Sequence, residues 1–117
     1  MNSEFYHDFK QCWEKIEEYG LLYATAQAKF HQSQDSKSTV LAKILCGIIK
    51  DNPGLPFTKA EVQAKASEDY QSHIDETAEL EETALTLKAK KEMWEAKFEG
   101  TRSLSSLEKV TQNQIGH

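Results

Sequence analysis

The side chains most able to do chemistry in this chain are those of its four histidines and two cysteines. They are His7, His31, His73 and His117, and Cys12 and Cys46. Zinc sites use close pairs such as two histidines four residues apart or a Cys-x-x-Cys motif, and neither spacing occurs here. We therefore expect no metal site and no cofactor.

Catalysis is not expected from the remaining residues either. The sequence has no glycine-rich phosphate loop and no nucleophile elbow. Cys12 falls on the apolar stripe of a predicted helix, where a thiol is usually buried and structural. Long helices that pair along a seam also offer no concave pocket in which groups could converge. We predict a protein that is not an enzyme and has no catalytic residues.

A run of acidic residues is the first candidate binding surface. Between Glu68 and Glu82 the chain carries many carboxylates and no Lys or Arg. This surface, called the acidic face, comprises Glu68, Asp69, Asp75, Glu76, Glu79 and Glu82. It could bind a basic protein partner, or it could be a solvated helix face that only pairs with its neighbour.

A basic group is the second candidate. Lys90, Lys91 and Arg102 lie near Trp94 and could contact phosphates while the ring stacks on a base. Acidic residues are interleaved with them, and the net charge is -5 with a pI near 5.4. Because this balance gives little counterion release, direct binding to nucleic acid should be weak, and a protein partner is favoured.

The elements that carry these residues are predicted to meet at a central turn. Residues 51–58 contain both prolines and a glycine, which end one helix and reverse the chain. Thr58 and Glu61 have the spacing of a capping box, and Phe57 and Val62 that of a hydrophobic staple. We predict one all-α domain over residues 1–117. Its parts are a helix at about 3–50, the turn at 51–58, a helix at about 59–109 and a frayed tail at 111–117.

Both helices have apolar residues at alternating spacings of three and four, which is the heptad pattern of a coiled coil. In the first helix the stripe is Phe5, Phe9, Cys12, Ile16, Tyr19, Tyr23, Ala26 and Phe30. In the second it is Ala66, Tyr70, His73, Thr77, Leu80, Ala84, Leu87, Lys91, Trp94, Phe98 and Thr101. The pattern predicts a long antiparallel, coiled-coil-like hairpin.

The stripe of the first helix becomes polar at Ser33 and Lys37. Folding the chain back about residue 55 places this gap beside Thr77 and His73, so polar residues face polar ones. A break of the first helix within residues 31–38 remains an alternative to one continuous helix.

Aromatic residues are concentrated at the open end of the hairpin. They are Phe5, Tyr6, Phe9, Trp13, Trp94 and Phe98. One antiparallel helix pair cannot cover all of them, and such a surplus is typical of an interface. We predict assembly into a helical-bundle dimer or a higher homo-oligomer, with a different protein as the second explanation.

The chain is expected to stay in the cytoplasm. Glu4 and Asp8 lie where a signal peptide would need positive charge. The apolar stretch at 40–49 is too short to span a bilayer and contains Lys43. No membrane association is expected.

Four runs, at 23–29, 37–45, 64–70 and 89–99, resemble a loose family of small helical proteins of tailed bacteriophages. The last reads Ala-Lys-Lys-Glu-Met-Trp-Glu-Ala-Lys-Phe-Glu, and the resemblance covers about residues 20–105. Members are often encoded among recombination and replication genes, near annealing and single-strand binding proteins.

The resemblance implies a non-catalytic accessory factor of phage DNA recombination or replication, which binds a nucleic-acid-handling protein in the host cytoplasm. Two alternatives remain open. One is an inhibitor of a host enzyme or defence complex that acts through the acidic face. The other is a structural or oligomerisation module.

Overall fold

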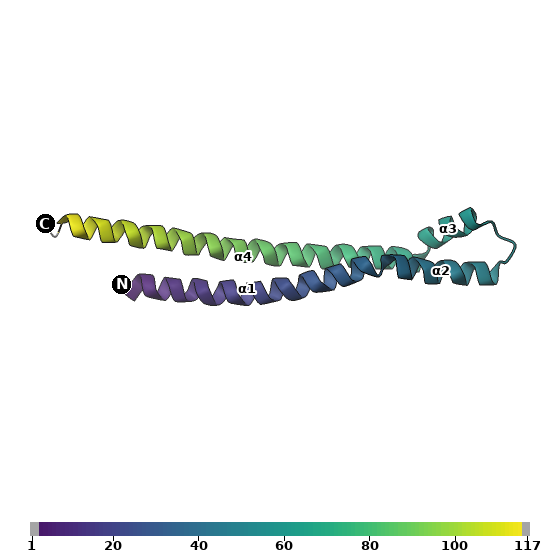
Figure 1. The fold of residues 1–117 in the computed structure, drawn as a ribbon, viewed down its shortest axis with the longest axis horizontal. Coiled ribbons are helices and arrows are strands. Elements are labelled where there is room, and N and C mark those ends of the chain that lie inside the picture. The colour runs from purple at the N-terminus through teal and green to yellow at the C-terminus, as the bar shows by residue number, and fades with distance from the viewer. Residues whose placement is uncertain (1–2, 116–117) are drawn as a thin grey trace. The chain divides into compact units, whose positions relative to one another are not determined.

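The computed structural model describes residues 3–115, and over this range the fold is all-α (Figure 1). No strand occurs within these residues. The helices are α1 (Ser3–Asp35), α2 (Lys37–Asp51), α3 (Phe57–Ala66) and α4 (Glu68–Ile115). The predicted all-α class is therefore confirmed, and assembly into a helical-bundle dimer or higher oligomer stays a prediction.

The chain divides into two compact units. The terminal unit combines Met1–Ala24 with Leu85–His117, and the turn unit is Thr25–Ala84. The single domain expected over the whole chain stays a prediction.

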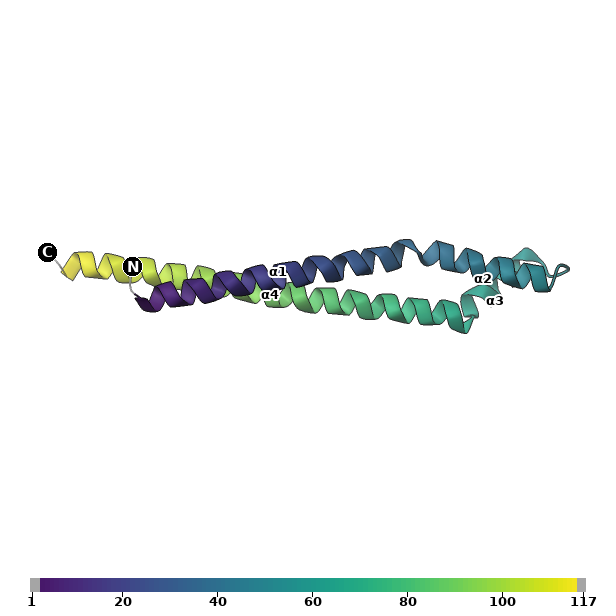
Figure 2. The same cartoon turned by 90° about the horizontal axis from the view of Figure 1, so that it is seen from below.

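In the terminal unit, the first part of α1 and the last part of α4 lie side by side and antiparallel (Figures 1 and 2). Cys12 of α1 is fully buried and Thr101 of α4 is 7% exposed. The rings of Phe9 and Phe98 pack edge to face, with centroids 5.3 Å apart. All four residues belong to the predicted stripes, so the heptad pattern correctly identifies the seam of this unit.

In the turn unit, α2 packs against α3, and the chain reverses between them. The first helix of the reversal ends at Asp51, where the N–H of Asn52 donates to the carbonyl of Ile48 (2.9 Å). The N–H of Leu55 then donates to the carbonyl of Asn52 (3.0 Å). The proline-containing turn and the antiparallel hairpin are therefore confirmed within this unit.

The predicted capping box is wrong. Helix α3 begins at Phe57 and follows Pro56, and no side chain caps its first turn. Pro56 is the N-cap residue, with the extended conformation usual at that position (φ -58°, ψ 142°), and its carbonyl accepts from the N–H of Ala60 (3.0 Å). The helix therefore begins before Thr58 can act as a cap, and Glu61 instead pairs with Lys65 (3.1 Å).

The predicted hydrophobic staple is not a buried contact. Phe57 is 60% exposed and Val62 is 68% exposed. A staple forms when the first residue lies outside the helix, but Phe57 is already its first residue.

The second predicted helix is interrupted at Ser67, a break that the residue pattern did not predict. Ser67 is extended (φ -64°, ψ 149°). Its hydroxyl donates to the carbonyl of Ala64 (2.7 Å) and accepts from the N–H of Tyr70 (3.2 Å). One side chain thus satisfies groups at the end of α3 and at the start of α4. Ala60 and Ala64 are buried, whereas Ala66, which was predicted to continue the stripe, is exposed.

The first predicted helix is also interrupted, within the polar segment where a break was the alternative. Helix α1 ends at Asp35 and α2 begins at Lys37. The carbonyl of Ser36 accepts from the N–H of Val40 (2.9 Å), and the Ser36 N–H donates to the carbonyl of Gln32 (3.1 Å), so backbone bonding spans the interruption. Ser36 is half-buried and Lys37 exposed, so Ser36 takes the stripe position that was predicted for Lys37, while Val40 and Ile44 are half-buried as predicted.

Helix α4 continues to Ile115, through most of the segment that was expected to fray from Thr111. The hydroxyl of Thr111 donates to the carbonyl of Leu107 (3.0 Å), as is common in a regular helix. The end of the predicted tail, residues 116–117, lies outside the described residues. No helix in the described range is both long and apolar enough to cross a lipid bilayer.

Candidate functional site: an aromatic groove

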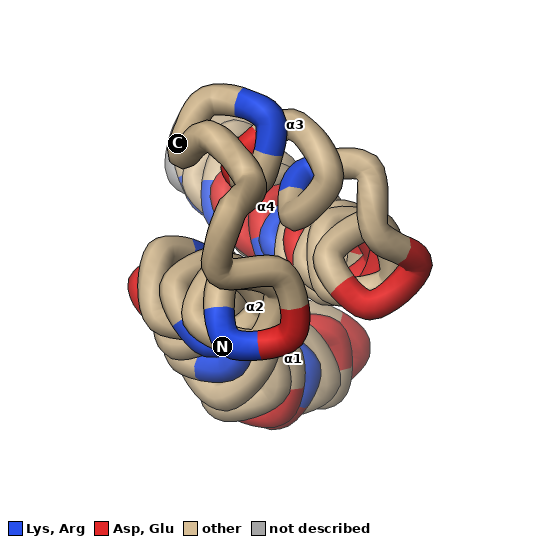
Figure 3. The backbone as a smooth tube through the Cα atoms, turned by 90° about the vertical axis from the view of Figure 1, so that its right-hand side faces the viewer, with Lys and Arg blue, Asp and Glu red and all other residues tan. Residues whose placement is uncertain are grey.

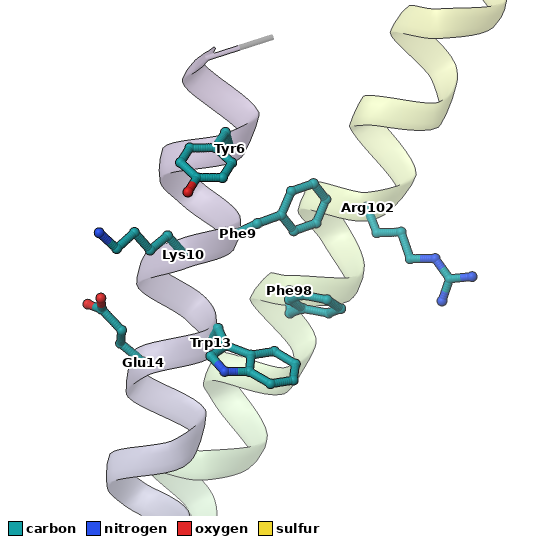
Figure 4. Close-up of a pocket in the computed structure, with 7 residues that line it drawn as sticks. All are labelled: Tyr6, Phe9, Lys10, Trp13, Glu14, Phe98 and Arg102. Carbon is teal, nitrogen blue, oxygen red and sulfur yellow. The ribbon is translucent and has the colours of Figure 1, made fainter. Parts of the chain in front are cut away.

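The terminal unit has an open groove of about 590 Å³ between α1 and α4 (Figure 4). We call it the aromatic groove. It is lined by Tyr6, Phe9, Lys10, Trp13, Glu14, Phe98 and Arg102. Its aromatic side chains come from both helices.

The groove exists because the apolar surface of α1 is wider than the seam. Phe9 belongs to the predicted stripe, whereas Tyr6 and Trp13 each follow a stripe residue by one position. In a heptad they lie beside the seam, where a single antiparallel partner cannot cover them. Tyr6 is 62% exposed and Trp13 is 66% exposed. Large apolar side chains therefore remain in contact with solvent.

The charged residues of the groove form its rim. Figure 4 shows Lys10 and Glu14 pointing away from Phe98 on the outer side of α1, and Arg102 pointing away from α1. The Nη1 of Arg102 lies 3.7 Å from the Oε2 of Glu99. Because both side chains are well exposed, this ion pair adds little stability. The rim offers one acid and two bases to an approaching surface.

The structure brings together most of the predicted aromatic interface. Tyr6, Phe9, Trp13 and Phe98 line the groove, and Phe5 is half-buried on the stripe. Trp94 is also half-buried, and the ammonium of Lys97 lies 4.8 Å from the centre of its ring.

Lys10 and Glu14 were not singled out from the sequence. A signal was available, because Lys10 lies four residues after Tyr6, and Glu14 lies four residues after Lys10. Residues at this spacing share one side of a helix. The sequence therefore indicates that Tyr6, Lys10 and Glu14 share one side of α1. It does not indicate that Lys10 and Glu14 line the same groove as Phe98 of α4.

The acidic face lies on the turn-unit part of α4, where acidic positions are coloured red in Figure 3. All six of its residues are exposed: Glu68, Asp69, Asp75, Glu76, Glu79 and Glu82. Their exposure leaves partner binding by the acidic face a prediction.

The three residues suggested for phosphate contact are not gathered at one place. The Lys90 ammonium lies 5.7 Å from the centre of the Tyr19 ring. Lys91 is half-buried and pairs with Glu95 (3.4 Å). Arg102 follows them by roughly 17 to 18 Å of helix, at about 1.5 Å per residue. Phosphate contact stays a prediction, because these three side chains do not form one binding site.

A polar layer in the turn unit matches the predicted gap in the stripe. The hydroxyl oxygens of Ser33 and Thr77 are 2.5 Å apart. The Nε2 of His73 lies 2.9 Å from the carbonyl oxygen of Ser33, and it must carry the proton because a carbonyl can only accept. We call Ser33, His73 and Thr77 the polar layer.

Both cysteines are free thiols, Cys12 buried and Cys46 exposed. Among the described residues, no three His, Cys, Asp or Glu side chains are grouped as a metal site requires.

Comparison with known proteins found no matching family model, no matching curated protein and no matching solved structure. Function is therefore inferred from the aromatic groove and from the surface charges.

Proposed function

We propose that this chain is a non-catalytic protein-interaction factor and that its aromatic groove receives the apolar side of a helix. The observation that carries the proposal is the exposure of Trp13, which is 66% accessible in a groove that it shares with Phe9 and Phe98. Aromatic side chains in open grooves are typical anchors of protein interfaces.

The shape of the surface supports a helix as the bound element. Two paired helices bury only the residues of their seam, whereas an apolar stripe that is one position wider suits a third or fourth helix. The groove runs between α1 and α4, so a helix lying along it would contact both. Recognition of a helix by apolar residues in a groove is a common binding mode.

The polar residues of the groove support a binding role over a chemical one. Lys10, Glu14 and Arg102 point outward at the rim and do not converge on a point between the helices (Figure 4). A general acid or base must approach a shared reacting atom within hydrogen-bond distance. Charges at a rim instead help to select and orient a partner.

The test compares Trp13→Ala with Met93→Ala. Met93 is 58% exposed on α4 of the same unit and does not line the groove, so it is a matched control. Both self-association and capture of other proteins would be measured. We expect Trp13→Ala to weaken at least one of them about tenfold or more, and Met93→Ala to change neither by more than about threefold, since truncating an interface anchor commonly costs more than about 1 kcal/mol. The proposal fails if Trp13→Ala leaves both unchanged.

We further propose that the partners include a nucleic-acid-handling protein of phage recombination or replication. The resemblance to small helical phage proteins and the exposure of the acidic face support this class. Such proteins carry basic surfaces, which an array of carboxylates complements.

A pull-down from host or infected-cell lysate tests this partner class. The altered bait carries Asp75→Lys, Glu76→Lys, Glu79→Lys and Glu82→Lys together. We expect the unaltered bait to retain a nucleic-acid enzyme and the altered bait to lose it. Equal retention by both baits would remove the acidic face from the proposal.

A further inference from the structure

We infer that the helix received by the aromatic groove is α1 of a second copy of this chain, lying antiparallel to the first. The two copies would be related by a two-fold axis at the level of Cys12 along α1, on the side of the helix away from this buried residue, so that Trp13 of each copy contacts the groove of the other. This inference rests on the proposed function, because it names the partner of the same groove.

The charges on the α1 rim of the aromatic groove are self-complementary in one direction only. Lys10 and Glu14 both line the groove, and Cys12 is midway between them in the sequence. A two-fold axis at this point places Lys10 of each copy opposite Glu14 of the other, so the pair forms twice. A parallel copy would instead place Lys10 opposite Lys10 and Glu14 opposite Glu14. Charge complementarity therefore selects the antiparallel arrangement.

A second pair of residues agrees with the same axis. His7 and Glu17 are both exposed, and their midpoint in the sequence is also Cys12. The axis therefore brings His7 to the same level along the helices as Glu17 of the other copy, where an imidazole and a carboxylate are compatible neighbours outside the groove lining. Each of these two residues lies three positions from one of the first pair, on the same side of the helix.

The aromatic residues give this arrangement its apolar contact. Trp13 is one residue from the axis, so the indoles of the two copies would lie close together over the paired grooves. The floor below them consists of Phe9 and Phe98, whose rings pack edge to face. Trp13 is 66% exposed in the single chain and would become covered in the dimer. The product is a bundle of two hairpin ends, in which the wide stripe of α1 is buried.

The first test is a charge reversal followed by sedimentation analysis of the full chain. Lys10→Glu would place two carboxylates opposite one another at both sites, because the new side chain faces Glu14 of the other copy. We expect the dimer dissociation constant to rise about tenfold or more. Adding Glu14→Lys exchanges the two charges and restores the pairing, so the double variant should return to within about threefold of the original value. A double variant as weak as the single one would contradict the proposed register.

A second test reads the direction of the helices. Single-cysteine variants Lys10→Cys and Glu14→Cys are prepared in a Cys46→Ser background, because Cys46 is exposed while Cys12 is buried. They are then mixed and treated with a short bis-maleimide. The antiparallel dimer should give the mixed product, which joins the two different variants, in excess over the two products that join like variants. An excess of the like products would overturn the inference in favour of a parallel dimer.

The outcomes also separate this inference from the proposed function. If the chain is monomeric and its capture of another protein depends on Trp13, the groove is a binding site but its partner is not a second copy of this chain. If neither Trp13→Ala nor Lys10→Glu changes the dimer dissociation constant, the chain self-associates through another surface and the inference is overturned. Unchanged helical circular dichroism would show that each variant is folded.

Discussion

Phe9 of α1 and Phe98 of α4 meet edge to face, with ring centroids 5.3 Å apart and an interplanar angle of 62°. This contact joins the two helices of the terminal unit, and both rings line the aromatic groove together with Tyr6 and Trp13. It therefore stabilises the helix pair and also forms the floor of the aromatic groove.

Replacing the second ring of this pair should destabilise the helices. Both phenylalanines are half-buried, so Phe98→Ala should lower the free energy of unfolding by about 2 kcal/mol, less than for a fully buried ring. Thermal unfolding followed by circular dichroism measures the change. Leu104→Ala is the control, because Leu104 is 59% exposed on the same helix and should cost less than about 0.5 kcal/mol. If both variants lower the free energy of unfolding equally, the contact between the Phe9 and Phe98 rings does not stabilise the helix pair more than an exposed residue does.

The Ser33–Thr77 contact of the polar layer should show coupling in a double-mutant cycle. Thr77→Val alone leaves the Ser33 hydroxyl without this partner and should cost about 1 to 2 kcal/mol of unfolding free energy. Combining it with Ser33→Ala removes both polar groups, so the double variant should be more stable than the sum of the single losses predicts. We expect a coupling of about 1 kcal/mol from urea unfolding. Additive losses would mean that the two hydroxyls do not stabilise one another.

Ser67 should be the residue that caps α4. Ser67→Ala removes the hydroxyl that accepts from the N–H of Tyr70, and it should lower the unfolding free energy by about 1 kcal/mol. Thr58→Ala is the matched comparison, because Thr58 lies inside α3 and no side chain caps that helix. Its cost should be below about 0.5 kcal/mol. A larger loss for Thr58→Ala than for Ser67→Ala would favour the capping box over the observed caps.

Gly20 offers a stabilising substitution. It is half-buried within α1, and a Cβ built on it would lie 3.9 Å from the Cε of Lys91, which is an ordinary contact. Gly20→Ala should therefore raise the unfolding free energy by about 1 kcal/mol through helix propensity. Gly47→Ala provides a second measurement, since nothing lies within 4 Å of its added Cβ. A loss of stability at Gly20 alone would show that the α1–α4 pair needs the glycine there.

The periodic features of the chain were predictable from its sequence. Spacings of three and four identified Cys12, Ala26, Tyr70, Ala84 and Thr101 as stripe residues, and all five are buried. The proline-containing turn was predictable for a similar reason, because proline and glycine restrict or free the backbone wherever they occur. The polar layer followed from matching two polar gaps in paired stripes.

The local breaks were less predictable, because they depend on competition between neighbouring signals. Thr58 and Glu61 had the spacing of a capping box, but the conformation of Pro56 allowed the helix to begin earlier. Ser67 looked like an ordinary helical serine, yet it ends α3 and caps α4 with one hydroxyl. Side-chain capping bonds are worth about 1 kcal/mol, which is small enough for local context to choose between candidate sites.

Helix type, seam and turn therefore follow from the order of residues, since periodicity and backbone restriction act over a few neighbouring positions. The aromatic groove required the packed fold. Lys10 and Glu14 become its rim, and Phe98 its floor, only because α1 and α4 pair with one particular rotation about their axes. That rotation is set by side chains far apart in the chain, and it decides which side of each helix stays exposed.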